Sequence, residues 1–229
     1  MNAAKGKRVR QLAWSGVKDQ PLLLAAALEG GTVVIVKEDG ELYQDIVIKA
    51  KSPGANATSL SWAPVVQTAG GLLLAIGWED GTVMVWSEKD VAVREDADAH
   101  APHPIGFALW SPDGTRLITG DARAAGAGQQ DTAVLAVWKV DNRGRFSTIC
   151  TYRRSATGAL THAIFRTEGV TKKVTSSMFA AAECPPFYFG GETGAISHGD
   201  AMGHSSDAIP SAGSPVAAML YHVEKDALV

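Results

Sequence analysis

The chain has 229 residues, of which 46% are hydrophobic and 20% charged, and this ordinary globular composition excludes intrinsic disorder and a collagen-like repeat. Its 21 basic and 24 acidic residues give a net charge of −3, so neither nucleic acid nor an anionic membrane is expected as the main partner. With only two cysteines, Cys150 and Cys184, the chain is not a disulfide scaffold, and reduced thiols in a cytosolic compartment are the simpler interpretation.

An aromatic residue followed by a turn recurs along the chain. Trp14, Trp62 and Trp110 stand 48 residues apart, and Phe165 and Tyr221 follow after 55 and 56 residues. The aromatic residues close short stretches in which apolar and polar side chains alternate, which is typical of a β-strand with one buried face. The series therefore predicts four repeated units and the opening of a fifth.

After the aromatic residue, each unit continues with a tight turn, an apolar strand, a second tight turn, a further strand and a more variable outer strand. The plainest first turn is Ser111-Pro112-Asp113-Gly114, because Pro presets the turn and Gly supplies a positive φ. In chain order, the expected strands are Leu22–Ala27, Thr32–Val36, Leu42–Ile48, Leu72–Gly77, Thr82–Trp86, Leu117–Gly120, Ala133–Trp138 and Phe146–Tyr152.

Four short strands per unit of about 40 to 45 residues are typical of a WD40 β-propeller blade. We therefore predict an all-β fold, an incomplete WD40 β-propeller of about four blades plus the start of a fifth. Residues 1–229 would form a partial N-terminal propeller, with blades near 9–50, 57–95, 104–152 and 159–198 and the next beginning at 214–229.

A ring usually needs about four to eight blades, so we expect the sequence to be a fragment of a longer protein. An open ring would expose one side of Leu23, Ala25 and Val34 in the first blade. In the fifth, a strand is expected around Ala217–Tyr221 and would lack a complete sheet to cover it.

WD40 blades often contain a buried hydrogen-bond network of a His, a Ser or Thr, an Asp and the strand-end Trp. The second unit keeps Asp80 and Trp86 but has Ile76 where the hydroxyl would stand. The third unit keeps His100, Thr119 and Trp138, and we expect the insertion at 122–131 to displace its acidic residue. A structural role is favoured over a catalytic one.

No catalytic, cofactor-binding or metal site is predicted. His100 and His103 resemble a metal pair, but no Cys or carboxylate cluster accompanies them, so we interpret 100–103 as a solvent loop. We expect His162 to be packed or at a strand edge. The other histidines, which show no partner spacing, are His198, His204 and His222.

Two small-residue segments are interpreted as loops. The stretch Gly126–Gly128 is not followed by the helix that a phosphate-binding loop needs. The polar stretch Gly199–Ser214 would join the fourth and fifth blades, and Ser205 and Ser206 within it lack the turn of a hydrolase nucleophile.

Basic residues cluster in the third and fourth units, at Arg143, Arg145, Arg153, Arg154, Lys172 and Lys173. A nucleic-acid surface would interleave aromatic residues, and only Tyr152 is near. A protein-binding surface or a solvated strand edge is therefore expected. Direct membrane insertion is not expected, because the first ten residues lack a signal-like apolar core and the apolar runs are far shorter than the roughly 20 residues of a membrane span.

Four stretches of the chain are similar to one known family: Leu73–Gly81, Trp110–Asp121, Ala136–Arg145 and Ala159–Arg166. They resemble the N-terminal WD40 domain of the intraflagellar transport protein 140 family, and the Leu-Thr-His-x-Ile-Phe-Arg stretch is more specific than a general WD40 pattern. Members of that family are long chains with two propellers followed by helical repeats. The insertion at 122–131 and the stretch between Arg166 and Phe187 depart from the family pattern.

The resemblance implies a non-enzymatic scaffold subunit of the intraflagellar transport A complex, supporting retrograde transport and cargo entry in cilia or flagella. Implied partners are the other subunits of that complex and ciliary membrane-protein cargo adaptors, and the implied locations are the cilium or flagellum, the basal body and the cytoplasm. The alternative is a generic WD40 adaptor of another assembly, such as a vesicle coat or a ubiquitin ligase. An enzyme is less favoured, because no polar residues converge on a channel.

Overall fold

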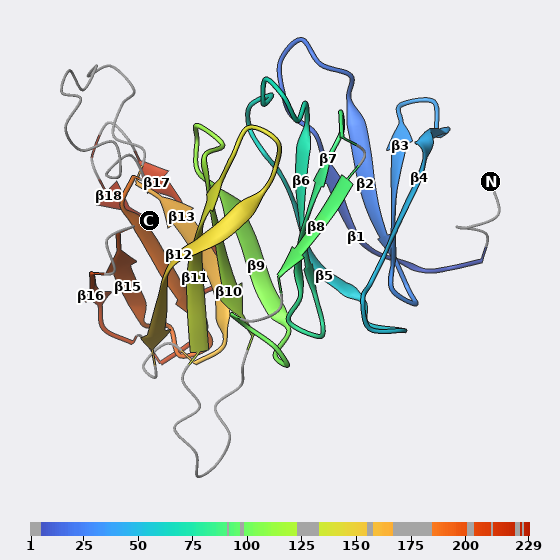
Figure 1. The fold of residues 1–229 in the computed structure, drawn as a ribbon. Coiled ribbons are helices and arrows are strands. Elements are labelled where there is room, and N and C mark those ends of the chain that lie inside the picture. Colours follow the sequence, from blue (N-terminus) through green and yellow to red (C-terminus); the bar gives the residue numbers. More distant parts are fainter. Residues whose placement is uncertain are drawn as a thin grey trace.

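Four-stranded antiparallel sheets follow one another along the chain and stack face to face (Figure 1). The computed structural model describes residues 6–90, 92–96, 99–122, 133–154, 158–166, 185–200, 204–211, 213–222, 225 and 227–229. Within each described sheet, every strand pairs with its neighbour in sequence, so the sheets are simple meanders. The all-β propeller architecture expected from the repeats is confirmed.

The strands are short, and the sheets differ most in the length of their outer strands. The first sheet contains β1 (Val9–Trp14), β2 (Leu23–Leu28), β3 (Thr32–Lys37) and β4 (Leu42–Lys49). The second contains β5 (Ala57–Trp62), β6 (Leu73–Trp78), β7 (Val83–Ser87) and β8 (Ala92–Asp96). The third contains β9 (Ile105–Trp110), β10 (Arg116–Asp121), β11 (Ala133–Val140) and β12 (Phe146–Arg154). The fourth contains β13 (Leu160–Phe165), β14 (Phe187–Gly191), β15 (Ile196–Gly199) and β16 (Ser205–Ile209).

A two-stranded hairpin of β17 (Tyr221–His222) and β18 (Ala227–Leu228) follows the fourth sheet. The expected strand around Ala217–Tyr221 is wrong in extent, because pairing begins only at Tyr221. The hairpin packs on the fourth sheet, where Tyr221 stacks on Tyr188 with ring centroids 6.5 Å apart. It therefore marks the start of a fifth sheet.

The tight turns lie where Gly and Pro predict them. The Gly114 N–H donates to the Ser111 carbonyl at 2.9 Å, and the φ of Gly114 is 70°. The turn between β6 and β7 closes in the same way, with Gly81 at a φ of 84° donating to the Trp78 carbonyl. Glycine adopts these left-handed conformations without the Cβ strain of other residues, so the two positions fix the hairpins.

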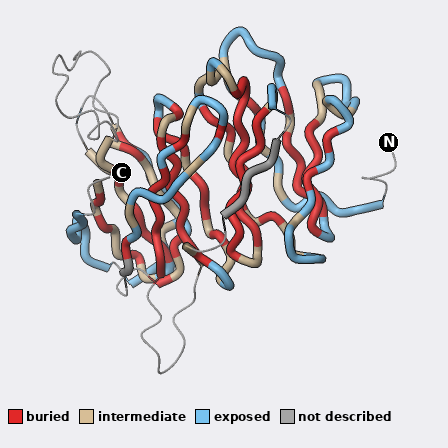
Figure 2. The backbone as a smooth tube through the Cα atoms, viewed as in Figure 1, coloured by how far each residue is buried: buried red, intermediate tan, exposed pale blue. Residues whose placement is uncertain are grey.

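Apolar side chains fill the space between neighbouring sheets, and the middle strands are the most deeply buried parts of the chain (Figure 2). One cluster joins the first sheet to the second, through residues such as Ala25, Ile35 and Trp86. A second cluster joins the second sheet to the third, and a third cluster joins the third sheet to the fourth. Because both faces of β6, β7, β10 and β11 are covered, the residues of these strands are buried almost throughout, and those of β6 and β7 are almost all apolar.

The innermost strands are held together by a repeated hydrogen bond. The indole of Trp62 donates to the Ala13 carbonyl of the preceding sheet at 2.9 Å. Trp110 donates to the Ser61 carbonyl in the same way at 2.8 Å. The aromatic residue that recurs in the sequence therefore packs in the core and also donates a hydrogen bond that joins neighbouring sheets.

The first sheet has one covered face and one open face, and the sheets formed by the described residues do not close into a ring (Figure 1). The sequence-based expectation that Leu23, Ala25 and Val34 are exposed is wrong. Leu23 and Ala25 are fully buried against the second sheet, and Val34 is buried in a small cluster with Ala26 and Leu28. Leu12 and Trp14 are exposed instead, by 55% and 52%. Successive residues of a strand point to opposite faces of the sheet. The side chains that do not face the second sheet therefore lie on the open face.

The expected loop over Gly199–Ser214 is also partly wrong. Residues Ser205–Ile209 form β16, the outer strand of the fourth sheet, paired with β15. Every residue of β16 is exposed, so the strand carries none of the apolar alternation by which strands are recognised in a sequence.

Candidate functional site: a buried polar network and the outer surface of the third sheet

A buried polar network lies inside the third sheet. The His100 Nε2 and Thr119 Oγ1 atoms are 2.7 Å apart, and the Trp138 indole donates to the same hydroxyl at 2.8 Å. All three residues are at most 1% exposed. The hydroxyl of Thr119 therefore joins the segment before β9 to the two middle strands of the sheet.

The acidic member of the network is present, which corrects the expectation that the insertion displaces it. Asp121 is the last residue of β10 and fully buried, and its Oδ2 lies 3.6 Å from His100 Nδ1. Its Oδ1 accepts a hydrogen bond from the Val134 N–H at 3.1 Å. The insertion follows Asp121 in the chain, so it lengthens the hairpin without moving the carboxylate.

Among the described residues, the second sheet has no such network, as the position of Ile76 predicts. Ile76 pairs with Met84 at the register position that Thr119 occupies in the third sheet. The Trp86 indole N–H is buried without a hydrogen-bond partner in the described part of the chain, and its ring packs edge-on against Trp62 at 6.0 Å. Asp80 instead accepts a hydrogen bond from the Thr82 N–H in the turn.

The other histidines occupy separate places. The solvent-loop interpretation is wrong for His100, whose side chain is buried, whereas His103 is half-buried in the adjoining turn. His162 Nδ1 lies 2.8 Å from Thr161 Oγ1, at the inner edge of the fourth sheet. The remaining contacts pair His198 with the Tyr188 ring, His204 with the Asp200 carboxylate and His222 with the Lys225 N–H.

Within the described ranges, no group of three or more His, Cys, Asp or Glu residues could hold a metal ion. Among the same residues, no helix is long and apolar enough to cross a membrane. Ser205 and Ser206 are exposed on β16. Several residues considered in the sequence lie outside the description: Gly126–Gly128, Lys172, Lys173 and the side chains of Arg153 and Arg154.

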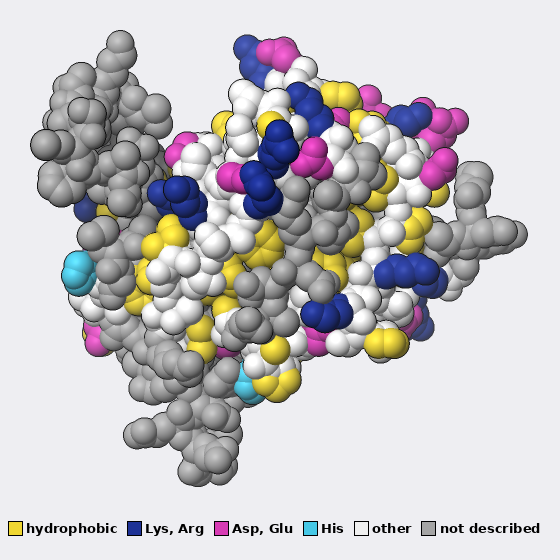
Figure 3. Space-filling model, in the orientation of Figure 1, with side chains coloured by type: hydrophobic (Ala, Val, Ile, Leu, Met, Phe, Trp, Pro, Cys, Tyr) yellow, Lys and Arg dark blue, Asp and Glu magenta, His cyan; other side chains and the backbone are white. Residues whose placement is uncertain are grey.

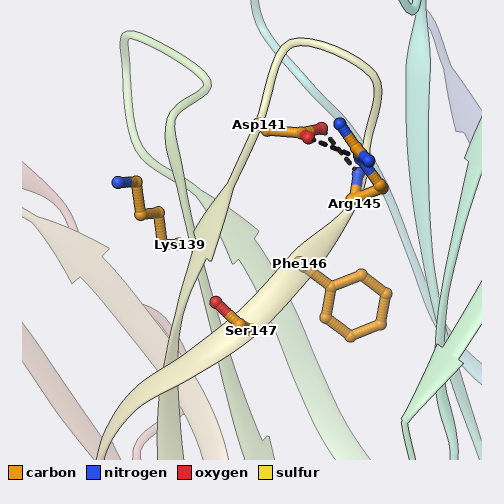
Figure 4. Close-up of a pocket in the computed structure, with 5 residues that line it drawn as sticks. All are labelled: Lys139, Asp141, Arg145, Phe146 and Ser147. Atoms are coloured by element: carbon orange, nitrogen blue, oxygen red, sulfur yellow. Dashed lines mark hydrogen bonds and ion pairs between the residues drawn. The ribbon is translucent and has the colours of Figure 1, made fainter.

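The β11–β12 hairpin forms a hollowed, charged surface on the third sheet (Figure 4). The Asp141 carboxylate accepts hydrogen bonds from the Arg143 and Arg145 N–H groups at 2.9 Å and an ion pair from the Arg145 guanidinium at 2.7 Å. Burial acts to raise the pKa of Asp141, but these hydrogen bonds outweigh it and lower the pKa. The ionised carboxylate therefore organises the turn.

A hollow of about 310 Å³ beside this turn is bordered by side chains of both strands: Lys139, Asp141, Arg145, Phe146 and Ser147. Phe146 also borders the hollow, and its ring packs edge-on against Trp138 at 5.3 Å. Figure 3 shows Lys and Arg side chains close to Asp and Glu side chains over the area of this hairpin. Sequence reasoning singled out Arg143 and Arg145 but missed Lys139 and Ser147, which only the strand register brings together.

A second hollow lies between the inner strands β1 and β5, beside Arg10, Gln11 and Thr58. The Arg10 guanidinium forms an ion pair with Glu79 at 3.0 Å. Glu79 also accepts two hydrogen bonds from Asn56, at 2.9 Å each. The hydrogen bond from the Asn56 backbone is the largest influence on the pKa of Glu79, which is lowered although burial opposes the shift.

Meander sheets of four strands that stack through apolar faces, with a His–Thr–Trp–Asp network inside the third sheet, define a WD40 β-propeller. The family model of the IFT140 first β-propeller matches residues 3–183. The chain therefore belongs to the family of IFT140 first β-propellers. This agrees with the resemblance seen in the sequence.

Solved structures show the same fold at low sequence identity. The WD40 domain of Toxoplasma gondii coronin superposes with a TM-score of 0.57 at 18% identity, over 90% of this chain and 46% of that one. Chaetomium thermophilum Sqt1, in its complex with the N-terminus of the ribosomal protein L10, gives a TM-score of 0.62 at 15% identity, over 94% of this chain and 53% of that one. The chain thus spans about half the length of these propellers.

Proposed function

We propose that this protein is a non-enzymatic scaffold subunit of the intraflagellar transport A complex, acting through protein–protein contacts. Membership of the IFT140 first β-propeller family carries the proposal. The structure is compatible with a scaffold, because the conspicuous buried polar residues tie strands together within a sheet. The exposed loops at the ends of the sheets can contact partner proteins.

The finer role that we propose is support of retrograde transport and of cargo entry into cilia or flagella. The partners would be other subunits of the complex and adaptors of ciliary membrane-protein cargo. The protein would be found in the cilium or flagellum, at the basal body and in the cytoplasm. Within the whole protein, residues 1–229 would belong to the N-terminal propeller.

Live imaging of the tagged protein in ciliated cells tests this role. We expect particles that move from the tip to the base of the cilium, and depletion should leave transport particles accumulated at the tip because their return is lost. A generic adaptor of a vesicle coat or a ubiquitin ligase would instead label endomembranes or the cytosol. Absence from cilia, with normal particle return after depletion, would contradict the proposal.

A further inference from the structure

Two cations face each other on the third sheet. Arg116 on β10 is directly opposite Lys139 on β11, and Lys139 is directly opposite Ser147 on β12. Directly opposed residues of an antiparallel pair share one face of the sheet, and opposed like charges destabilise it. An anion next to this row would remove the repulsion.

The hydrogen bonds of Arg116 are incomplete. The residue is only 6% exposed, its Nη1 donates to the Thr115 carbonyl at 3.0 Å, and its Nε is buried without a hydrogen-bond partner in the described part of the chain. Asp113 is the nearby acid, and its carboxylate already accepts hydrogen bonds from Ser111 and from Thr115. The guanidinium of Arg116 therefore adds positive charge beside Lys139, and this charge favours an anion there without direct contact.

The neighbouring charges leave this surface positive. Lys139 is exposed, and no ion pair to it occurs among the described residues. Asp141 is engaged by Arg145 and by two backbone N–H groups. The turn is also held in place by the second sheet, because the Gly70 N–H donates to the Asn142 carbonyl at 2.6 Å. Lys139 and Arg145 therefore border the hollow from a hairpin that is held in place.

The hollow lies beside an open strand edge. The strand β12 is at the end of its sheet and pairs with β11 alone among the described strands. Residues Phe146–Thr148 are in regular register with β11, and the register shifts only beyond Thr148. The free edge of such a stretch can pair with a short extended segment.

We propose that Lys139, Arg145 and Ser147, with Arg116 opposite Lys139 on the neighbouring strand, form a docking site for a short extended acidic segment of a partner protein. An Asp or Glu carboxylate of the segment would lie in the hollow beside Lys139, and its backbone would run along Phe146–Thr148. A long polyanion is disfavoured by Asp113 and Asp141 nearby and by the net charge of −3. The proposal rests on the scaffold role and names the chemistry of one partner.

Fluorescence anisotropy with a fluorescein-labelled octapeptide of alternating Glu and Val tests the site in the 229-residue chain. Lys139→Glu should weaken binding about tenfold, because it reverses a charge that meets the carboxylate. Ser147→Asp should weaken it about fivefold by placing a competing carboxylate opposite Lys139. The matched control is Lys18→Glu, which makes the same charge change on an exposed loop of the first sheet and should stay within about twofold of the parent.

Circular dichroism melting shows whether each variant is folded, and Lys139 is exposed enough for substitution to leave the fold intact. Binding of the peptide by Lys139→Glu as tightly as by the parent overturns the inference, and so does an equal loss in Lys18→Glu. The same holds if an octapeptide with Lys in place of Glu binds equally well. None of these outcomes bears on the proposed function, which is tested by ciliary imaging of the natural protein.

Discussion

Trp86 in the second sheet and Trp138 in the third occupy the same position in the repeat, and both are at most 1% exposed. The indole of Trp138 donates to Thr119, whereas that of Trp86 has no hydrogen-bond partner among the described residues. Both sheets nevertheless have the same strand order and stack on both neighbours. Apolar stacking is therefore sufficient to form a sheet, and the polar network is an addition to it.

The two sheets also differ in how they hold the segment that precedes them. In the third sheet, His100 ties that segment to Thr119 and Asp121 in the interior. In the second sheet, Asn56 is tied to Glu79 near the surface, and Arg10 joins the same carboxylate. A buried contact thus holds one segment and a half-exposed contact the other, and the two should respond differently to mutation.

The largest effect on stability is expected from removing the indole ring of Trp86 or of Trp138. Trp86→Ala and Trp138→Ala should each lower the free energy of unfolding by about 3–5 kcal/mol, because each leaves a large cavity between sheets. Trp138→Ala should lie at the upper end, since it also removes the donor to Thr119. Urea denaturation measures both, and midpoints equal to that of the parent would show that these rings are not core residues.

A smaller substitution separates the ring from its hydrogen bond. Trp138→Phe should cost about 1–3 kcal/mol more than Trp86→Phe, because only the first leaves a buried hydroxyl without its donor. The two changes remove equal volumes, so each is the control for the other. Equal losses in denaturation would mean that the network contributes nothing beyond packing.

The network bond can also be introduced into the second sheet. Ile76→Thr places a hydroxyl at the register position of Thr119, within reach of the unused Trp86 donor. A double-mutant cycle of Ile76→Thr with Trp86→Phe should show a favourable coupling of about 1 kcal/mol. A coupling of zero would show that the two sheets differ in more than this one side chain.

The smallest effect on stability is expected from Glu79, the half-exposed carboxylate that Asn56 and Arg10 contact. The pKa of Glu79 is lowered in the folded chain from its ordinary value of 4.5, chiefly by the Asn56 backbone. Its contribution to stability is therefore complete above about pH 4.5 and is lost as the pH falls through the lower folded pKa. Glu79→Gln should flatten the decline of the thermal midpoint below pH 4.5, and an unchanged decline would rule out this carboxylate as its cause.

The sequence repeats predict the sheets because each repeated aromatic residue, turn and apolar segment has the same structural role in every sheet. Trp62 and Trp110 fasten neighbouring sheets, and Gly81 and Gly114 close hairpins with left-handed backbone. Contacts between elements could not be predicted in the same way. The row of Arg116, Lys139 and Ser147 exists only through the register of three strands.

Two further misses have separate physical causes. Asp121 belongs to the network because it comes before the long insertion, whereas the sequence predicted that the insertion displaces the acidic residue. The outer strand β16 was interpreted as a loop because all of its residues face solvent and none needs to be apolar. Patterns of apolar residues in a sequence predict strands with a buried face, but they do not predict outer strands whose residues are all exposed.

Capture of the natural full-length protein from ciliated cells tests the central claim most directly. We expect the tagged protein to bring down the other subunits of the intraflagellar transport A complex in near-equal amounts, measured by quantitative mass spectrometry. Recovery should be unchanged by Lys18→Glu, which leaves the stacked sheets intact, and reduced by Trp138→Ala, which opens a cavity between them. Recovery of coat or ubiquitin-ligase subunits in place of that complex would contradict the proposed function.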